Sequence, residues 1–117
     1  IVVHFGLIPS SRVRQTAHLK AYIAREIPLD EPVVVAGDFN DWGTRVRRLL
    51  HVDPLHAFEG PRTLTYPSRY PVAQLDHIYA RGLRPLSLQA PRGRIWSRMS
   101  DHLPLIAEFN LPGTSAT

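Results

Sequence analysis

The spacing of apolar and polar residues divides the first half of the chain into a strand, a long helix and a second strand. The apolar start at residues 1–7 predicts a strand. From Arg12 to Ile27 apolar residues recur every three to four positions, which is typical of an amphipathic helix. Ser10-Ser11 can cap this helix, and Pro28 ends it. The continuous apolar run 33–36 predicts a short strand buried on both faces.

In the second half of the chain, the sequence predicts shorter helices and strands between Pro-rich loops. Gly37 to Gly43 is expected to be a loop, and Thr44 to cap a short helix ending at Leu50. Further strands are predicted at residues 64–66, 74–80, 83–89 and 103–109. This order favours a mixed α/β (α+β) fold, in which a mostly antiparallel mixed sheet carries one main helix and short helices on one face. Residues 111–117 are expected to form a flexible tail.

Composition narrows the class of protein. A length of 117 residues allows one domain at most, and the absence of Cys excludes disulfides, thiolate metal sites and a Cys nucleophile. No apolar run approaches the roughly 18–20 residues of a membrane span and no signal peptide is visible, so we expect no transmembrane segment and a cytoplasmic location. The chain opens on Ile1-Val2-Val3 without an initiator Met, which favours a piece of a longer protein.

The net charge of +4 and a pI near 10.1 suit a polyanionic partner such as nucleic acid. However, the arginines are dispersed and form no long run, which favours an ordinary solvated surface.

Polar residues directly after the run 33–36 are the first candidates for chemistry. Asp38 and Asn40 follow the carboxyl end of a predicted strand, where open α/β sheets place ligands. If the backbone stays extended, the two side chains project to the same side. A carboxylate and a neutral amide together suit a phosphate beside a cation, whereas a Gly-Asp-x-Asn turn is an equally good interpretation.

Two further candidates precede or begin the later strands. Asp101 can hold a hard cation, and the adjacent His102 can contact a phosphoryl oxygen or move a proton near neutral pH. Taken alone, a capped entry to the last strand is an equally good interpretation of this pair. Asp76 shares a strand face with Ile78, which is costly unless the carboxylate is paired. A partner such as His102 would resolve this cost, and an edge strand facing water is the alternative.

Taken together, four motifs in order resemble the endonuclease/exonuclease/phosphatase (DNase I-like) superfamily over roughly residues 1 to 110. They are Val3-His4-Phe5-Gly6-Leu7, Gly37-Asp38-Phe39-Asn40, Leu75-Asp76-His77-Ile78 and Ser100-Asp101-His102-Leu103-Pro104-Leu105. The resemblance implies a family fold of two sheets packed face to face with helices outside. The chain then corresponds to the C-terminal half of this four-layer α/β sandwich, with a domain segment at 1–110.

The resemblance also implies roles for the catalytic and metal-binding residues. Asp38 would orient or deprotonate the attacking water and, with Asp101, hold Mg2+, with Mn2+ as an alternative. Asn40 would bind the scissile phosphate. His102, oriented by Asp76, would contact the phosphoryl oxygens or transfer a proton.

Two more sets of residues receive roles in this interpretation. His4 matches a second family histidine that assists leaving-group protonation in some members, although a lone strand His is more often structural. Arg94 and Arg98 flank Trp96 shortly before Asp101 and are candidates for contacts to a phosphate-rich substrate, and an ordinary surface is an equally good interpretation.

The implied function is a metal-dependent phosphodiesterase, endonuclease or phosphatase acting on nucleic acid, phospholipid or inositol phosphate esters. The family's early Asn and metal-binding Glu have no counterpart before His4, so we expect little activity from these 117 residues without the N-terminal half of the domain. The uncovered sheet face predicts self-association. The alternative is a non-catalytic module of the same fold that binds nucleic acid or another protein.

Overall fold

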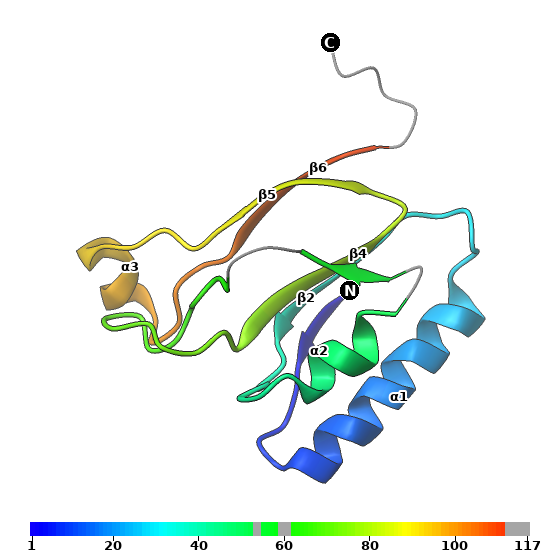
Figure 1. Cartoon of the computed structure of the whole chain (residues 1–117), viewed down its shortest axis with the longest axis horizontal. Helices are drawn as coiled ribbons and strands as arrows, with labels where there is room; N and C mark the ends of the chain where they lie inside the picture. The colour runs from blue at the N-terminus through cyan, green and yellow to red at the C-terminus, as the bar shows by residue number, and fades with distance from the viewer. Residues whose placement is uncertain (53–54, 59–61, 112–117) are drawn as a thin grey trace.

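Strands and helices alternate along most of the chain (Figure 1). The computed structural model describes residues 1–52, 55–58 and 62–111, so most of the predicted tail at 111–117 lies outside the described residues. The elements are β1 (Val2–His4), α1 (Pro9–Glu26), β2 (Val33–Asp38), α2 (Arg45–Leu50), β3 (His56–Ala57), β4 (Asp76–Arg81), β5 (Arg84–Gln89), α3 (Arg94–Met99) and β6 (Ile106–Asn110). Among the described residues, no helix is both long enough and apolar enough to cross a bilayer.

The strands form a mixed sheet and a separate ribbon. The sheet has the order β1-β2-β4-β3, with β1 parallel to β2 and the other neighbours antiparallel. Strands β5 and β6 pair with each other as an antiparallel ribbon. The predicted α/β (α+β) class with a mostly antiparallel mixed sheet is therefore confirmed. Figure 1 shows α1 and α2 together on one side, whereas α3 stands apart at the other end, so the prediction that the short helices share one face is wrong for α3.

The hydrophobic core lies between one face of the sheet and the helices α1 and α2. Side chains alternate along a strand, so Val33 and Val35 of β2 point into this core together with Tyr79 of β4. The intervening residues, such as Val34 and Ile78, are only half-buried. The prediction that the run 33–36 is buried on both faces is therefore wrong for this chain, because helices cover only one face.

Both predicted helix caps differ from the structure. Helix α1 begins at Pro9, whose fixed φ suits the first helical position, and Ile8 is the residue before it. Ser10 and Ser11 thus lie inside the first turn. Thr44 precedes α2 but makes no side-chain capping bond. The carboxylate of Asp41 accepts instead from the backbone N–H groups at the start of α2, at 3.2 and 3.0 Å.

Several other boundaries shift. Residues 64–66 form no strand, only an isolated bridge between Tyr66 and Ala73, and the last strand begins at 106 instead of 103. The two-residue strand β3 and the helix α3 were not predicted. Helix α3 has only six residues and none of them is buried, so it is too short for an apolar period to identify it in the sequence.

Candidate active site

Three polar side chains form a row across one end of the four-stranded sheet. In the sheet register His4 at the end of β1 lies beside Asp38 at the end of β2, and Asp38 lies opposite Asp76 at the start of β4. Register partners project to the same face, and this is the face that α1 and α2 leave open. The row therefore follows directly from strand pairing.

The imidazole of His102 lies between the two carboxylates of this row. Its Nδ1 donates to Asp76 Oδ2 at 2.7 Å, and its Nε2 lies 3.7 Å from Asp38 Oδ2. The Nε2 atom of His4 approaches the same Asp38 oxygen to 3.6 Å from the exposed side. Like charges directly opposite on neighbouring strands repel each other, so the bridging imidazole stabilises this arrangement.

A buried threonine fixes the orientation of Asp76. The Thr65 hydroxyl, which is fully buried, donates to Asp76 Oδ2 at 2.7 Å. The Thr65 carbonyl accepts from the N–H of Leu103 at 2.7 Å, which holds the segment that carries His102. Asp76 and His102 are therefore oriented by the same short segment of chain.

The electrostatic surroundings favour a protonated His102. Partial burial disfavours the imidazolium, but the hydrogen bond to Asp76 and the negative charges of Asp76, Asp38 and Asp101 together raise the pKa of His102 above its ordinary value of 6.5. With Nδ1 committed to Asp76, the second proton of the imidazolium resides on Nε2, on the side of Asp38. The site thus holds a mobile proton beside a carboxylate.

Asn40 is held by the backbone. Its φ of 48° is left-handed, so the expectation that Asn40 and Asp38 project to one side from an extended backbone is wrong. Its backbone N–H donates to Asp38 Oδ1 at 2.8 Å, and its side-chain amide donates to the carbonyl of Phe5 at 2.5 Å. These bonds tie the end of β2 to the end of β1 and leave Asp38 Oδ2 outside the turn. A phosphate-binding role for Asn40 stays a prediction.

The carboxylate of Asp38 is the group best placed to offer an oxygen to a cation. One atom each of Asp38, Asp76 and His102 lies within 4.8 Å of the others. Asp76 Oδ2 already accepts from Thr65 and from His102, whereas Asp38 Oδ2 accepts no hydrogen bond from the backbone. Asp101 is exposed and stands outside this close group. Mg2+ commonly takes one or two carboxylates and keeps several waters, so a set of this kind fits it.

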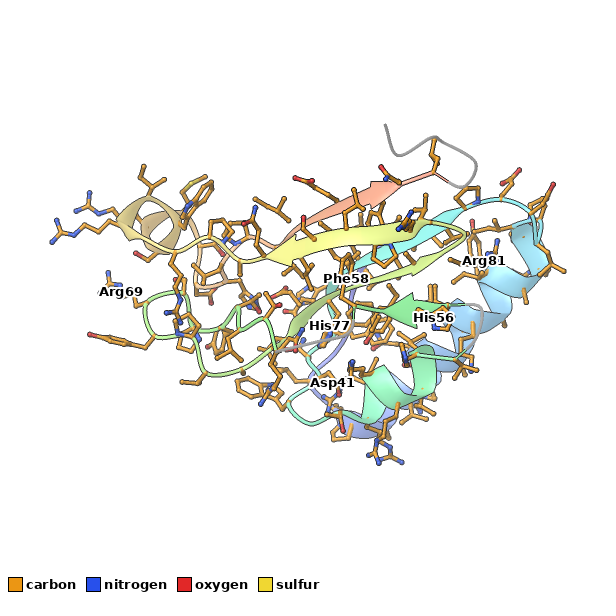
Figure 2. All side chains as sticks on the ribbon, turned by 45° about the horizontal axis from the view of Figure 1, so that its top comes forward. Asp41, His56, Phe58, Arg69, His77 and Arg81 are labelled. Carbon is orange, nitrogen blue, oxygen red and sulfur yellow. The ribbon has the colours of Figure 1, made fainter. Side chains whose placement is uncertain are left out.

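The predicted arginines lie outside this row, in a cavity near the same end of the molecule. Arg94 and Arg98 belong to α3 and are exposed. They line a cavity with Arg69, which Figure 2 places at the opposite end of the molecule from Arg81, the last residue of β4. The structure therefore brings His4, Asp38, Asp76 and His102 together but leaves Arg94 and Arg98 in a neighbouring cavity.

Two residues next to His102 are not among the site residues assigned from the sequence. Thr65 orients Asp76, and the ring of Tyr66 packs on the imidazole of His102 with a centroid distance of 4.9 Å. Trp42 packs in turn against Tyr66 at 5.7 Å. A Thr-Tyr-Pro-Ser stretch shortly before Leu75-Asp76 was a usable signal, but its contacts depend on pairing with residues 101–103, which spacing alone does not reveal.

Comparisons with known proteins identify the family of the chain. Residues 2–102 match the model of the Endonuclease/Exonuclease/phosphatase family. The chain is 37% identical over 114 residues to YbhP of Escherichia coli (strain K12), whose name describes it as uncharacterized. The match covers 93% of this chain and 45% of YbhP, so the chain spans about half the length of that relative.

Solved structures show the same fold. An endonuclease/exonuclease/phosphatase from Bacteroides vulgatus superposes with a TM-score of 0.76 at 22% identity, over 92% of this chain and 47% of that chain. The mannosyl-6-phosphatase Bt3783 of Bacteroides thetaiotaomicron VPI-5482 superposes with a TM-score of 0.70 at 16% identity, over 92% and 49%. These likenesses establish the architecture of a half-domain.

Proposed function

Because the chain belongs to the endonuclease/exonuclease/phosphatase family, whose members are phosphoester hydrolases that generally depend on a divalent metal, we propose that it carries one half of a Mg2+-dependent phosphoester hydrolase. The observation that supports this most is the row His4–Asp38–Asp76 bridged by His102. Hydrolysis of a phosphoester needs an aligned water, a positive charge over the phosphoryl oxygens and a proton for the leaving oxygen.

Each of these requirements is assigned to a different residue of the site. Asp38 Oδ2 orients the attacking water or accepts its proton, since Oδ1 is held by the N–H of Asn40. His102 holds a proton at Nε2 for a phosphoryl or leaving oxygen, and Asp76 keeps the ring in that tautomer. His4 reaches the site from the exposed side and is a second proton donor.

The carboxylates of Asp38 and Asp101 are the groups we assign to Mg2+, with Mn2+ as a substitute. When bound, the cation would polarise a phosphoryl oxygen and neutralise developing charge. Two carboxylates are a minimal set, so we propose that the 117 residues alone have little activity and that the remaining ligands come from the other half of the domain.

The test is hydrolysis of bis-p-nitrophenyl phosphate by the 117-residue chain and by a longer protein that contains it. We expect hydrolysis by the longer protein with Mg2+, loss of it with EDTA, and a loss of about 100-fold or more in Asp38→Asn. Asp30→Asn, on an exposed turn remote from the row, is the matched control. Full activity in EDTA, or in Asp38→Asn, would overturn the proposal.

The non-catalytic alternative gives a different result in the same experiment. It requires that no form of the protein hydrolyses the ester and that DNA binding, steeply dependent on salt, survives Asp38→Ala.

A further inference from the structure

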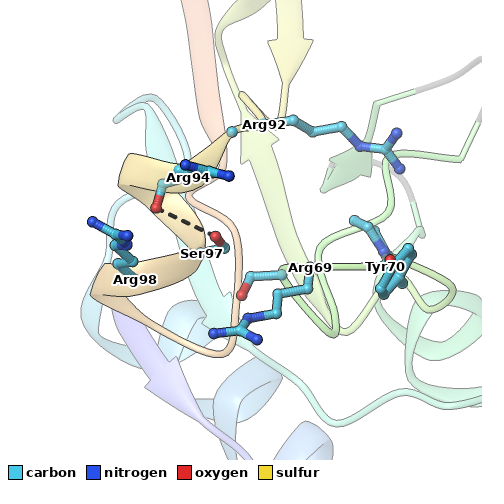
Figure 3. Close-up of a pocket in the computed structure, with 9 residues that line it drawn as sticks. Arg69, Tyr70, Arg92, Arg94, Ser97 and Arg98 are labelled. Carbon is cyan, nitrogen blue, oxygen red and sulfur yellow. Dashed lines mark hydrogen bonds between the residues drawn. The ribbon is translucent and has the colours of Figure 1, made fainter.

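A cavity lined by arginines lies beside the catalytic row and has no part in it. Its volume is about 690 Å3, and it lies between the loop at residues 68–71 and the segment at residues 92–98 (Figure 3). Its four cationic lining residues are Arg69, Arg92, Arg94 and Arg98, all exposed. None of the four residues of the catalytic row lines it.

Ion pairing distinguishes the arginines of this cavity from Arg25 on α1. In the part of the chain that the structure describes, no ion pair joins any of the four to a carboxylate, whereas Arg25 on α1 pairs with Glu26 at 2.8 Å. Like charges that border one hollow repel each other, and an anion that enters lowers this cost. The charge of the cavity therefore selects an anionic ligand.

The directions of the side chains favour a phosphate group over a diffuse negative surface. In Figure 3 Arg69 and Arg94 extend into the space between the loop and α3, whereas Arg92 extends to the side on which Tyr70 lies. Arg98 is drawn on the opposite side of the helix. Guanidinium groups bind phosphate oxygens through paired N–H donors, so the arginines that border this space suit a phosphate group.

The cavity is continuous with the surface next to the catalytic row. A smaller cavity of about 370 Å3 shares Ser68, Arg69 and Arg98 with it and extends to Asp101, the residue before His102. The loop is also anchored there, because the backbone N–H of Ser68 donates to the Asp101 carbonyl at 2.7 Å and its hydroxyl to the Ser100 carbonyl at 2.7 Å. A ligand that fills both places runs from the arginines toward His102.

We propose that this arginine cavity binds a second phosphate of the substrate, beyond the phosphate that is hydrolysed at Asp38 and His102. The substrate class is then a compound with at least two phosphates, either a nucleic acid strand or a small polyphosphorylated molecule. The ring of Tyr70, which is 82% exposed at the cavity, offers a flat apolar surface for the part of the substrate between or beside the phosphates. The assignment to a substrate rests on the proposed function, whereas the binding of phosphate does not.

The binding test uses inorganic tripolyphosphate and isothermal titration calorimetry in EDTA, so that hydrolysis plays no part. The double variant Arg69→Gln/Arg94→Gln is compared with Arg14→Gln/Arg84→Gln, which removes the same charge from exposed positions that line no part of the cavity. We expect affinity to fall about tenfold or more in the first variant and to stay within about twofold in the second. Circular dichroism of both variants checks that the fold is retained.

The source of the phosphates is distinguished by two further probes. An oligothymidylate that competes with tripolyphosphate and depends on Arg69 and Arg94 identifies a nucleic acid backbone, whereas tripolyphosphate binding without oligothymidylate binding identifies a small molecule. Equal loss of affinity in both double variants, no binding of tripolyphosphate, or binding only to phosphatidylcholine vesicles that contain phosphatidylserine would overturn the proposal. Arginine-dependent binding by a longer protein that contains this chain and hydrolyses no ester with Mg2+ would refute the proposed function and leave the phosphate site standing.

Discussion

Replacing Asp76 with Asn removes one charge from the centre of the candidate site and changes little else. The substitution keeps the size of the side chain, and the remaining oxygen can still accept from the Thr65 hydroxyl. What it removes is the ionic part of the 2.7 Å hydrogen bond from His102 Nδ1. The two side chains are 18% and 25% exposed, so solvent only partly screens this interaction.

The size of the effect follows from the difference between charged and neutral hydrogen bonds. A bond to a charged group contributes about 1.5–3 kcal/mol and a neutral bond about 0.5–1.5 kcal/mol. The difference for this partly exposed pair is at the lower end, so we expect Asp76→Asn to lower the free energy of unfolding by about 1 kcal/mol.

The effect must depend on pH in a defined direction. Partial burial lowers the pKa of His102 in the folded protein, but the bond to Asp76 and the nearby carboxylates raise it by more. The folded state therefore binds the proton more tightly than the unfolded state. The resulting stabilisation is complete below the ordinary pKa of 6.5 and is lost as the pH rises through the folded value. Asp76→Asn should cost more stability at about pH 6 than at about pH 9.

Urea denaturation at the two pH values, followed by circular dichroism in a chelator, measures this difference. A loss of 1 kcal/mol corresponds to a fall of about 0.5–1 M in the denaturation midpoint. The control Asp30→Asn makes the same chemical change at an exposed turn and should stay within about 0.5 kcal/mol. An equal loss at both pH values, or a loss that grows with pH, would show that the carboxylate does not stabilise the imidazolium.

Three further substitutions test the elements that hold the site. Gly37→Ala should cost about 3 kcal/mol or more in unfolding free energy, because φ is 148° and a Cβ would overlap the backbone of Val3 on β1. Arg81→Met should cost about 1–3 kcal/mol, because the buried guanidinium donates to two carbonyls of the turn before β2, both at 2.9 Å. Burial lowers the pKa of His77 in the folded protein. The neutral ring therefore contributes stability above pH 6.5 that is lost as the pH falls. In His77→Gln the unfolding free energy should fall less steeply on acidification.

Each of these substitutions has a matched control measured by the same denaturation assay. A Cβ at Gly43 meets no atom within 4 Å, so Gly43→Ala should be nearly neutral. Arg84→Met and His18→Gln change exposed residues and should leave stability and its pH dependence unchanged. A control that is as destabilising as its test variant would contradict the corresponding argument.

The pairing of Asp76 with His102 could be predicted from the sequence. A carboxylate on a strand beside Ile78 needs a partner, and the Asp-His pair before the last apolar segment supplies one. The geometry of Asn40 could not be predicted in the same way, because its left-handed backbone is set by the carbonyl of Phe5, a residue 35 positions earlier.

Two elements of the fold, β3 and α3, could not be predicted from patterns in the sequence either. Apolar periodicity located α1, which buries one stripe of side chains, and a continuous apolar run located β2. The strand β3 has only two residues, and α3 buries none of its side chains, so neither produces a periodic signal. The cavity beside α3 was therefore visible in the sequence only as scattered arginines.

The hydrogen bond between Asp76 and His102 also bears on the order of folding. It joins residues 26 positions apart, and the row that it completes includes the ends of β1 and β2. Closing loops of this length costs more chain entropy than forming local contacts. Helix α1 can therefore form before the side chains of the row come together. We therefore expect these side chains to come together after α1 during refolding, so that protonation of His102 depends on the pairing of distant segments and not on local structure alone.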